Sequence, residues 1–591
     1  MAMPDITVQQ ASALAAQHYQ AGNLGQAETL CRQILSVQPN HAEALHLLGV
    51  LAHNAGHHDD AVAWIERALL HHPTNPSAHS NLGEACLALG RTTEAIEHYR
   101  RALALDSRFA IASYNLGNAF RAQGRLDEAV AAYRRALQLD SNDPKGYSNL
   151  ASTLAVLGRL DDAIAAYREA IRLMPQEPSI QSSLICLLRL HPGSDEQAIV
   201  DEHQNWNRQF AEPLRPSLRP HTNHRVPHRR LRIGYVSPDF RIHAELLFLA
   251  PLFGEHDHTQ FEIHCYSSVV APDAGTEFLR ARADVWHDVR HLSDAELATE
   301  IRAAQIDILV DLSMHTVGNR LPLFARKPAP VQVSWLAYPG ITGLDTIDYR
   351  ITDRYLDPSA DLDFTSAEKP ILLPDCWCCY HPFTDETPVN PVPALSAGRI
   401  TFGCFNNFSK FNEETLARFS RVLHSVKNSH LVLLAPEGSA QRHLSERFAH
   451  YGIAGDRIEF AATGSRADYL RRYHRVDIAL DTLPSNGMAT TCETLWMGVP
   501  VISLVGETSV GRAGLGLLST IGLPELVTRT PDEFVSTATQ LATDLPRLAD
   551  LRATMRSRME SSPLMDAPRF ARHLEAAYRE MWHRWCATPA R

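Results

Sequence analysis

The segment DTLPSNGMATTCETLWMGVP, residues 481–500, places small and hydroxyl-bearing residues where a helix is expected to begin. An apolar run precedes this segment. Within the segment, a Pro/Ser/Asn/Gly turn comes first, and the pattern then predicts a helix from about Ala489. The free N–H groups and the dipole of a helix N-terminus favour an anion, and Thr490 and Thr491 add hydroxyl donors. Glu493 lies one turn further in, where its carboxylate could accept hydrogen bonds from ribose hydroxyls. A nucleoside diphosphate fits this pattern; a capped structural helix is the alternative.

Two common nucleotide-binding motifs are missing from the sequence. It contains neither G-x-x-x-x-G-K-[ST] nor a G-x-G-x-x-G that follows a strand, which disfavours a P-loop or an NAD-binding fold. One cysteine cluster, in LPDCWCCYHP (373–382), lacks a second paired-cysteine half at zinc spacing. We therefore interpret Cys376, Cys378 and Cys379 as buried or strand-end residues rather than as metal ligands.

The elements that must position such a site are short apolar runs that alternate with helical segments. The runs are LRIGYVS (231–237), FEIHCYS (261–267), IDILVDLS (306–313), VQVSWLAY (331–338), RITFGCFNN (399–407), HLVLLAP (430–436), RIEFAA (457–462), VDIALD (476–481) and PVISLVG (500–506). Such runs predict parallel sheets covered on both faces. We expect two doubly wound α/β domains of about five strands each, with TPVNPVPALSAG (387–398) as connector. Because ligands bind at the carboxyl ends of parallel strands, two facing domains would enclose a cleft.

The first third of the chain repeats every 34 residues. The repeat is carried by three sets of positions: Leu48, Leu82, Leu116 and Leu150; Gly56, Gly90, Gly124 and Gly158; Ala61, Ala95, Ala129 and Ala163. This period and the small residues predict an α-solenoid of tetratricopeptide repeats, a superhelix with two helices per repeat.

A row of asparagines recurs at the same step on the first helix of each repeat: Asn81, Asn115 and Asn149. First helices line the concave groove of such a superhelix. Asparagine amides can both donate to and accept from an extended peptide backbone, so this row is a candidate peptide-binding surface. The alternative is that these side chains solvate a helix face or bond a neighbouring turn.

Composition excludes several classes of function. A chain of 591 residues predicts several domains, since single cores stop growing near ~250–300 residues. The net charge of −11 argues against broad electrostatic binding of nucleic acid or of acidic membranes. No run approaches the ~18 apolar residues that span a bilayer. The N-terminus shows no signal-peptide pattern, and the ten cysteines are scattered. We expect a cytoplasmic protein.

Five motifs together resemble one enzyme family: GYVSPDFRIH (234–243), DILVDLSMHT (307–316), KPAPVQVSWLAYPGITGLDTIDYRITD (327–353), FGCFNNFSKFN (402–412) and LDTLPSNGMATTCETLWMGVPV (480–501). With the repeats, the chain resembles the protein O-glycosyltransferases that comprise O-GlcNAc transferase and SPINDLY. The resemblance implies tetratricopeptide repeats fused to a two-domain GT-B catalytic region. It also implies transfer of a sugar from a nucleotide sugar to Ser or Thr of a protein, with inversion and with no metal or other cofactor.

The resemblance assigns roles to individual residues. Lys410 matches the lysine that binds the donor diphosphate, where an ammonium opposes the charge of the leaving group. His243 matches an active-site histidine that could orient the sugar or assist removal of the acceptor proton. The other matched positions are Asn407 beside the diphosphate, Leu336, Ala337 and Pro339 in the sugar pocket, and Thr490 and Glu493 at the diphosphate and ribose. From position alone, Asp311 and His315 are further catalytic candidates at a strand end that should face the cleft.

The chain departs from O-GlcNAc transferase at several donor positions. Met488, Ala489 and Thr490 replace His-Thr-Thr, Tyr469 replaces a histidine near the base, and Arg466 replaces a lysine near the ribose. The base should lie beside ATGSRADYL (462–470), where Tyr469 could stack on it and Ala462, Gly464 and Ser465 leave room for a purine. Some segments resemble SPINDLY, whose plant members are associated with GDP-fucose. UDP-GlcNAc is the leading donor, and GDP-fucose is the alternative.

The leading hypothesis is therefore an inverting glycosyltransferase acting on Ser/Thr of intracellular proteins, held in the repeat groove. A repeat scaffold with a decayed catalytic half, and an enzyme that modifies Asn or a small molecule, remain alternatives; the oligomeric state stays open. The expected domains are 1–190, tetratricopeptide superhelix; 191–230, a helical and Pro-rich linker; 231–390, the first GT-B domain; 391–560, the nucleotide-sugar domain; and 561–591, a C-terminal helix.

Overall fold

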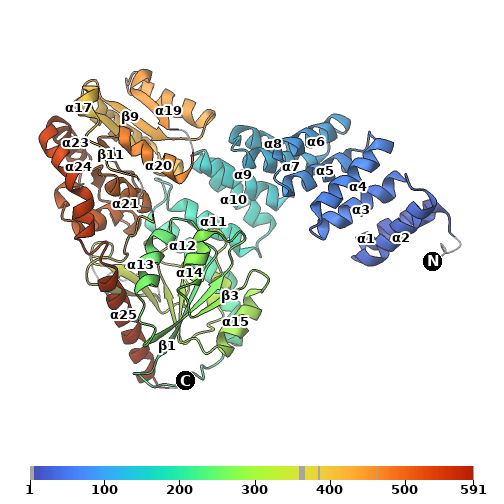
Figure 1. Cartoon of the computed structure of the whole chain (residues 1–591), viewed down its shortest axis with the longest axis horizontal. Coiled ribbons are helices and arrows are strands. Elements are labelled where there is room, and N and C mark those ends of the chain that lie inside the picture. Colours follow the sequence, from blue (N-terminus) through green and yellow to red (C-terminus); the bar gives the residue numbers. More distant parts are fainter. Residues whose placement is uncertain (1–5, 359–366, 384–386, 462–463, 590–591) are drawn as a thin grey trace. The chain divides into compact units, whose positions relative to one another are not determined.

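The computed structural model describes residues 6–358, 367–383, 387–461 and 464–589 (Figure 1). The chain divides into two compact units. The first comprises residues 1–174 together with the short segment 436–439, and the second comprises residues 175–435 and 440–591. None of the described helices is long and apolar enough to cross a membrane.

The first unit consists of consecutive helix pairs in the predicted 34-residue register. Its helices are α1 (Val8–Gln20), α2 (Leu24–Val37), α3 (Ala42–Asn54), α4 (His58–His71), α5 (Pro76–Ala88), α6 (Thr92–Leu105), α7 (Ala110–Ala122), α8 (Leu126–Leu139), α9 (Pro144–Val156) and α10 (Leu160–Leu173). The recurring small residues let the helices approach closely. A Cβ atom on Gly83 would lie only 2.7 Å from a ring carbon of Tyr99, and on Gly117 only 2.6 Å from Tyr133. The α-solenoid prediction is confirmed.

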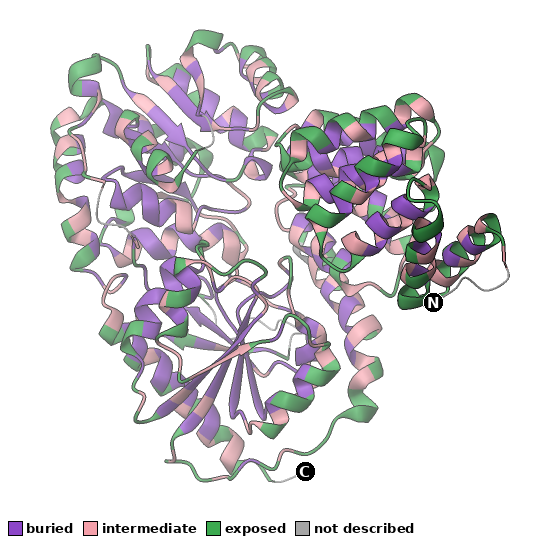
Figure 2. Cartoon of the chain, turned by 45° about the vertical axis from the view of Figure 1, so that its right-hand side comes forward, coloured by how far each residue is buried: buried purple, intermediate pink, exposed green. Residues whose placement is uncertain are grey.

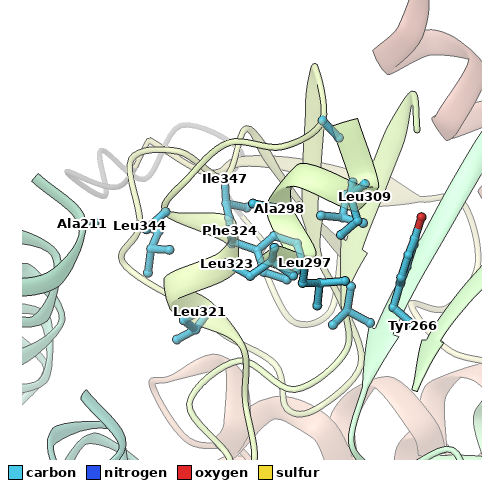
Figure 3. Packing of buried hydrophobic residues seen from close by; sticks show 14 of the residues in the cluster. Ala211, Tyr266, Leu297, Ala298, Leu309, Leu321, Leu323, Phe324, Leu344 and Ile347 are labelled. Carbon is cyan, nitrogen blue, oxygen red and sulfur yellow. The ribbon is translucent and has the colours of Figure 1, made fainter. Parts of the chain in front are cut away.

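The second unit begins with two further helices, α11 (Pro178–Leu188) and α12 (Glu196–Trp206). The segment 191–230 had been expected as a linker, but part of it is core. Trp206 is fully buried and Ala211 is 1% exposed, in one apolar cluster with Ile185 of α11. Figure 3 shows Ala211 of this cluster with Tyr266 and Leu309 of the first sheet. The helix in this segment, α12, packs into the same core as the first sheet, which its amphipathic pattern alone does not reveal.

The first sheet has seven parallel strands in the order β3-β2-β1-β4-β5-β6-β7. The strands are β1 (Leu231–Ser237), β2 (Phe261–Ser267), β3 (Val285–Asp288), β4 (Ile308–Asp311), β5 (Val331–Ser334), β6 (Tyr349–Asp353) and β7 (Lys369–Leu373). Helices α13 (Leu246–Glu255), α14 (Ala274–Arg280), α15 (Asp294–Ala303) and α16 (Leu321–Phe324) connect them. The last helix, α25 (Ala567–Ala587), contacts α13, β5 and β7, so the end of the chain packs on this sheet.

The second sheet has six parallel strands in the order β10-β9-β8-β11-β12-β13. The strands are β8 (Thr401–Cys404), β9 (His430–Leu434), β10 (Ile458–Ala461), β11 (Ile478–Leu480), β12 (Val501–Leu504) and β13 (Val527–Thr528). Its helices are α17 (Ala394–Ala397), α18 (Glu413–Ser425), α19 (Ser439–His450), α20 (Arg466–Arg472), α21 (Ala489–Trp496), α22 (Ala513–Thr520), α23 (Pro531–Thr543) and α24 (Leu545–Glu560). The central strands of both sheets are buried, as parallel sheets covered by helices require (Figure 2).

Candidate functional site

The loop between β11 and α21 is built around the carboxylate of Asp481. Asp481 is 2% exposed and accepts hydrogen bonds from the backbone N–H groups of Thr482 (2.9 Å) and Gly487 (2.8 Å). The side chains of Asn406 (3.0 Å) and Ser503 (2.7 Å) donate to the same carboxylate. Burial raises the pKa of Asp481, whereas the bonds from Gly487, Ser503 and Thr482 favour its charged form. The turn that precedes α21 is therefore organised by protein groups alone.

Lys410 approaches this turn from the end of β8. Its Nζ donates to the backbone oxygen of Asn486 at 2.7 Å, three residues before α21 begins. Burial lowers the pKa of Lys410, and the neighbouring carboxylate of Asp481 acts in the opposite direction. Asn407 is exposed and caps the short turn that carries Lys410, because its Oδ1 accepts from the N–H of Ser409 (3.2 Å). The structure thus places the ammonium group beside the turn that precedes α21.

Helix α21 begins at Ala489, as the sequence predicts. Met488 at its N-cap makes no side-chain capping bond, so the first N–H groups of the helix are not satisfied by a cap. Ala489 and Thr490 are half-buried, but Thr491 is 3% exposed and its hydroxyl donates to the backbone oxygen of Gly487 (3.0 Å). Thr490 is therefore the hydroxyl that remains at the accessible side of the helix start. This end of α21 can accept an anion.

Glu493 is already paired in the structure. Arg466 donates to its carboxylate at 2.5 Å and also donates to the backbone oxygen of Pro382 at 2.9 Å. Glu493 is 6% exposed, and burial raises its pKa against the attraction of Arg466. The hydroxyl of Tyr469 lies 2.8 Å from that of Tyr473 and also interacts with Glu493. A ribose hydroxyl would therefore meet an Arg–Glu pair rather than a free carboxylate.

The expected base loop is described only in part. Ala462 lies outside the described residues, and Gly464 is exposed. The half-buried ring of Tyr469 meets Phe405 edge-on at a centroid distance of 6.4 Å. The guanidinium of Arg472 lies 5.6 Å from the centroid of the Tyr469 ring. Aromatic and guanidinium planes thus gather beside α20, which are groups that can stack on a base.

The expected sugar-pocket residues lie on the loop 335–343, which follows β5. Leu336 has φ +83°, a left-handed conformation that costs a non-glycine residue roughly 1–2 kcal/mol. Ala337 is half-buried and Pro339 is buried in the same loop. Backbone in such a conformation persists only where the surrounding structure holds it.

A buried carboxylate holds this loop from inside. Glu368 is 3% exposed and accepts from the N–H (2.7 Å) and hydroxyl (2.6 Å) of Thr342, from the N–H of Gly343 (2.9 Å) and from Ser334 (2.8 Å). Burial raises the pKa of Glu368, and these donors lower it. Sequence reasoning missed Glu368, because no motif surrounds it.

His243 lies exposed on the loop after β1, with two carboxylates beside it. One ligand atom each of Asp239, His243 and Glu245 lie within 4.8 Å of one another, a spacing that could hold a cation or share a proton. The N–H of Glu245 points to Nδ1 of His243 at 3.5 Å. The protein packed around the ring lowers the pKa of His243, whereas Asp239 raises it. Buried Glu245 has its own pKa raised well above the usual value, by burial and then by Asp239.

Two features connect these parts of the chain. The segment after β7 connects the His243 side to the nucleotide side, because the N–H of His381 donates to Leu247 of α13 (2.7 Å) and the next residue, Pro382, accepts from Arg466. In addition, the loop 335–343 and the turn before α21 border one pocket of ≈ 110 Å³, whose walls include Pro339 and Pro484. A lysine and a helix N-terminus on one side, with a fixed loop and a histidine on the other, suit a phosphorylated donor and a second reactant.

Comparison with known proteins agrees with this arrangement. The family described as glycosyl transferase family 41 matches residues 191–379 and 393–574. The chain belongs to glycosyl transferase family 41. A tetratricopeptide repeat family matches residues 13–79, 55–108, 80–144 and 114–178. The resemblance stated from the motifs is thereby confirmed.

Several relatives of this family 41 protein are plant proteins. The chain is 38% identical over 415 residues to the probable UDP-N-acetylglucosamine–peptide N-acetylglucosaminyltransferase SPINDLY of Solanum lycopersicum, covering 69% of this chain and 44% of that one. It is 32% identical over 371 residues to the probable transferase SEC of Arabidopsis thaliana, covering 61% and 38%. The chain thus spans less than half the length of these curated relatives.

A solved structure matches most of the family 41 chain. A mutant of the O-GlcNAc transferase of Thermobaculum terrenum superposes with a TM-score of 0.79 at 35% identity, covering 86% of this chain and 98% of that one. The expected fold, tetratricopeptide repeats followed by two Rossmann-like domains, is confirmed.

Two further candidates in this family 41 chain, His315 and Asp311, are buried. His315 is 1% exposed, with its ring edge-on to His203 and Trp206 of α12. Asp311 is fully buried and accepts from the N–H groups of Ser313 (3.1 Å) and Met314 (2.9 Å); burial raises its pKa to about 7. Helices α11 and α12 cover His315 through Ser182, His203 and Trp206, so its ring packs inside the protein. Nothing in the sequence placed those helices there.

The asparagine row bridges neighbouring repeats instead of standing free. Asn81 donates to His46 (2.9 Å), Asn115 donates to Glu84, and Asn149 donates to Tyr114 (2.8 Å). Asn115 is only 8% exposed. Asn81 and Glu84 also line a hollow of ≈ 890 Å³ on the first repeats, together with residues of α1, α3 and α5. The three asparagines therefore connect the first helices of neighbouring repeats by hydrogen bonds. Of the three, only Asn81 borders this hollow.

Proposed function

We propose that the protein is an inverting glycosyltransferase that moves a sugar from a nucleotide sugar to Ser or Thr of intracellular proteins. The observation that carries the proposal is the pairing of Lys410 with the uncapped start of α21. The half-buried ammonium of Lys410 and the free N–H groups of the helix, beside the turn that Asp481 organises, would oppose the charge that grows on a departing diphosphate. Such preorganised charge lowers the barrier without reorganisation during the reaction.

The other residues take supporting roles in this proposal. The backbone at Leu336, Ala337 and Pro339 would hold the sugar, and His243 would orient it or take part in removing the acceptor proton. Lys410 and the helix N-terminus supply the positive charge, so we propose that no metal is needed. The hollow of the first repeats would receive the acceptor polypeptide.

Two nucleotide sugars are candidates for the donor. The names of the plant relatives and of the solved structure favour UDP-GlcNAc. The second candidate is GDP-fucose, favoured by the higher identity to SPINDLY (38%) than to SEC (32%). The aromatic and guanidinium groups near Tyr469 suit either base.

The test is direct transfer by the purified full chain. The protein is incubated in EDTA with UDP-GlcNAc or GDP-fucose and a set of unfolded polypeptides, and the acceptors are mapped by mass spectrometry. We expect one donor to give hexosamine- or deoxyhexose-modified Ser/Thr. No modification with any donor would favour a decayed scaffold. Modification of Asn, or activity that requires a divalent ion, would contradict the proposed chemistry and direct attention to Asp239, His243 and Glu245.

A further inference from the structure

Arg189, the residue that caps the C-terminus of helix α11, contacts the loop 335–343. The guanidinium carbon of Arg189 lies 3.4 Å from the centroid of the Tyr338 ring, which is a close cation–π stack. Its Nη2 also donates to the backbone oxygen of Pro339 at 2.9 Å. One planar side chain therefore fixes the ring of one residue and the carbonyl of the next.

The fit between Arg189 and the loop leaves no spare room. Gly340 has φ +153°, and a Cβ atom there would lie 2.9 Å from Nη1 of Arg189. At the far end of the loop, Gly343 has φ +77°, and a Cβ atom would lie 2.5 Å from Cβ of His203 in α12. Both glycines allow α11 and α12 to approach the loop backbone directly.

A second connection from α11 runs through a buried histidine. The hydroxyl of Ser182 donates to Nδ1 of His315 (3.0 Å), and Nε2 of His315 donates to the backbone oxygen of Thr342 (2.8 Å). This pair of bonds fixes the neutral tautomer with the proton on Nε2, and burial holds the pKa of His315 well below its usual value. Helix α11 thus holds the loop at Tyr338 and Pro339 and again at Thr342.

We propose that Arg189 is a positioning residue that fixes the sugar-binding backbone of the loop 335–343, so that α11 belongs to the donor site. The inference rests on the proposed function, because it assumes that this loop holds the donor sugar. Arg189 contacts Tyr338 and Pro339, which follow Leu336 by two and three residues in the chain. Leu336 is the residue of this loop with the left-handed backbone. Arg189 lines the pocket that Pro484 of the turn also borders, but none of its described hydrogen bonds or ring contacts reaches Lys410 or α21.

This separation predicts an effect on the sugar but not on the nucleotide. Loss of Arg189 frees the backbone that meets the sugar and leaves the Asp481 turn intact. Arg189→Ala should therefore weaken binding of the nucleotide sugar roughly tenfold, while affinity for the nucleoside diphosphate stays within twofold. Arg189→Lys keeps a charge and a donor but has no planar group to stack on Tyr338, so a smaller loss is expected.

The experiment uses calorimetry on the full-length protein. Dissociation constants are measured for UDP, UDP-GlcNAc, GDP and GDP-fucose with the wild type, with both Arg189 variants and with Arg208→Ala. Arg208 is an exposed arginine after α12, so its variant should match the wild type. Donor KM should rise in Arg189→Ala with a smaller change in kcat.

The outcomes separate the inference from the proposed function. A loss confined to the nucleotide sugar supports the positioning role. Equal losses of affinity for nucleotide and nucleotide sugar, or no loss of either, overturn the positioning role. If Arg189→Ala does not fold, the same two affinities are compared in Arg189→Lys. A wild type that binds none of the four ligands overturns the proposed function and the inference with it.

Discussion

Lys410 concentrates the proposed chemistry in one side chain. Its ammonium contacts the backbone oxygen of Asn486, and a phosphate would replace that contact with a stronger, charge-assisted one. Burial lowers the pKa of Lys410 from the ordinary 10.5, while Asp481 counteracts the shift. The carboxylate that the loop itself supplies therefore favours the charged form of Lys410.

Replacement of Lys410 tests this role at the scale of one residue. Lys410→Ala should lower kcat by about 10²–10³-fold, because the leaving diphosphate loses its counter-charge, and should also weaken nucleotide binding. In the wild type, Lys410 loses its charge as the pH rises through its pKa, which is lowered from 10.5. Nucleotide affinity should therefore decrease as the pH is raised, and the decrease should begin before pH 10.5 is reached. The measurement is steady-state turnover with nucleotide titrations from pH 7 to pH 10. Lys427→Ala, at an exposed lysine, is the control. A variant at position 410 with unchanged kcat would remove Lys410 from the mechanism.

Individual residues were predictable where a motif carried them. The start of α21 was predicted because strand, turn and helix signals are contiguous in sequence, whereas Lys410 was assigned through the family resemblance of its motif. The partner of Glu493 was not, because Arg466 precedes it by 27 residues and the pair exists only in the folded chain. Glu368 and Arg189 were not predicted as site residues for the same reason. Each forms a hydrogen bond with backbone that lies far away in the sequence.

At the scale of elements, the turn and α21 form one device. Gly487 lets the turn pass beneath Asn406, since a Cβ atom on Gly487 would lie 2.5 Å from Oδ1 of Asn406 and 2.7 Å from Oγ1 of Thr491. Asn406 cannot move away freely because it donates to Asp481 and to Thr482. The position of the helix start therefore depends on the absence of one methyl group.

Gly487→Ala should accordingly uncouple nucleotide binding from overall folding. We expect a stability loss of about 1–3 kcal/mol from overpacking and at least a tenfold loss of nucleotide affinity. Denaturant unfolding and calorimetry measure the two effects. The matched control is Gly455→Ala, where a Cβ atom would meet nothing within 4 Å. If both variants bind nucleotide like the wild type, the turn is not the diphosphate site.

Elements were predictable in proportion to their apolar content. All nine apolar runs contain a strand, whereas β3, β6, β7 and β13 were not predicted. β3 (VWHD) and β13 (VT) are too short for a pattern, and β6 (YRITD) is polar although it is buried. Helices α11 and α12 were not predicted to pack with the first sheet, because the residues that share their core, such as Leu309 of β4, are distant in the chain.

For the whole molecule, the division falls at residue 174 rather than at the expected 190. Helix α11 continues the 34-residue spacing, since Pro178 follows Pro144 and Pro76 in register, yet it belongs to the second unit. Through Arg189 and Ser182 it completes the loop 335–343. The sequence pattern could not separate α11 from the repeats, because its amphipathic period is the same and only its contacts differ.

Deletion of residues 1–174 is therefore the informative truncation. It retains α11 and the whole candidate site, so affinity for nucleotide and nucleotide sugar should stay within threefold, about 0.6 kcal/mol. Transfer to unfolded polypeptide acceptors should be lost, because the hollow lined by α1, α3 and α5 is removed. A second deletion that extends through residue 190 removes α11 and Arg189, and should cost sugar-nucleotide affinity in addition. Acceptor kinetics unchanged by the first deletion would show that the repeats do not deliver the substrate.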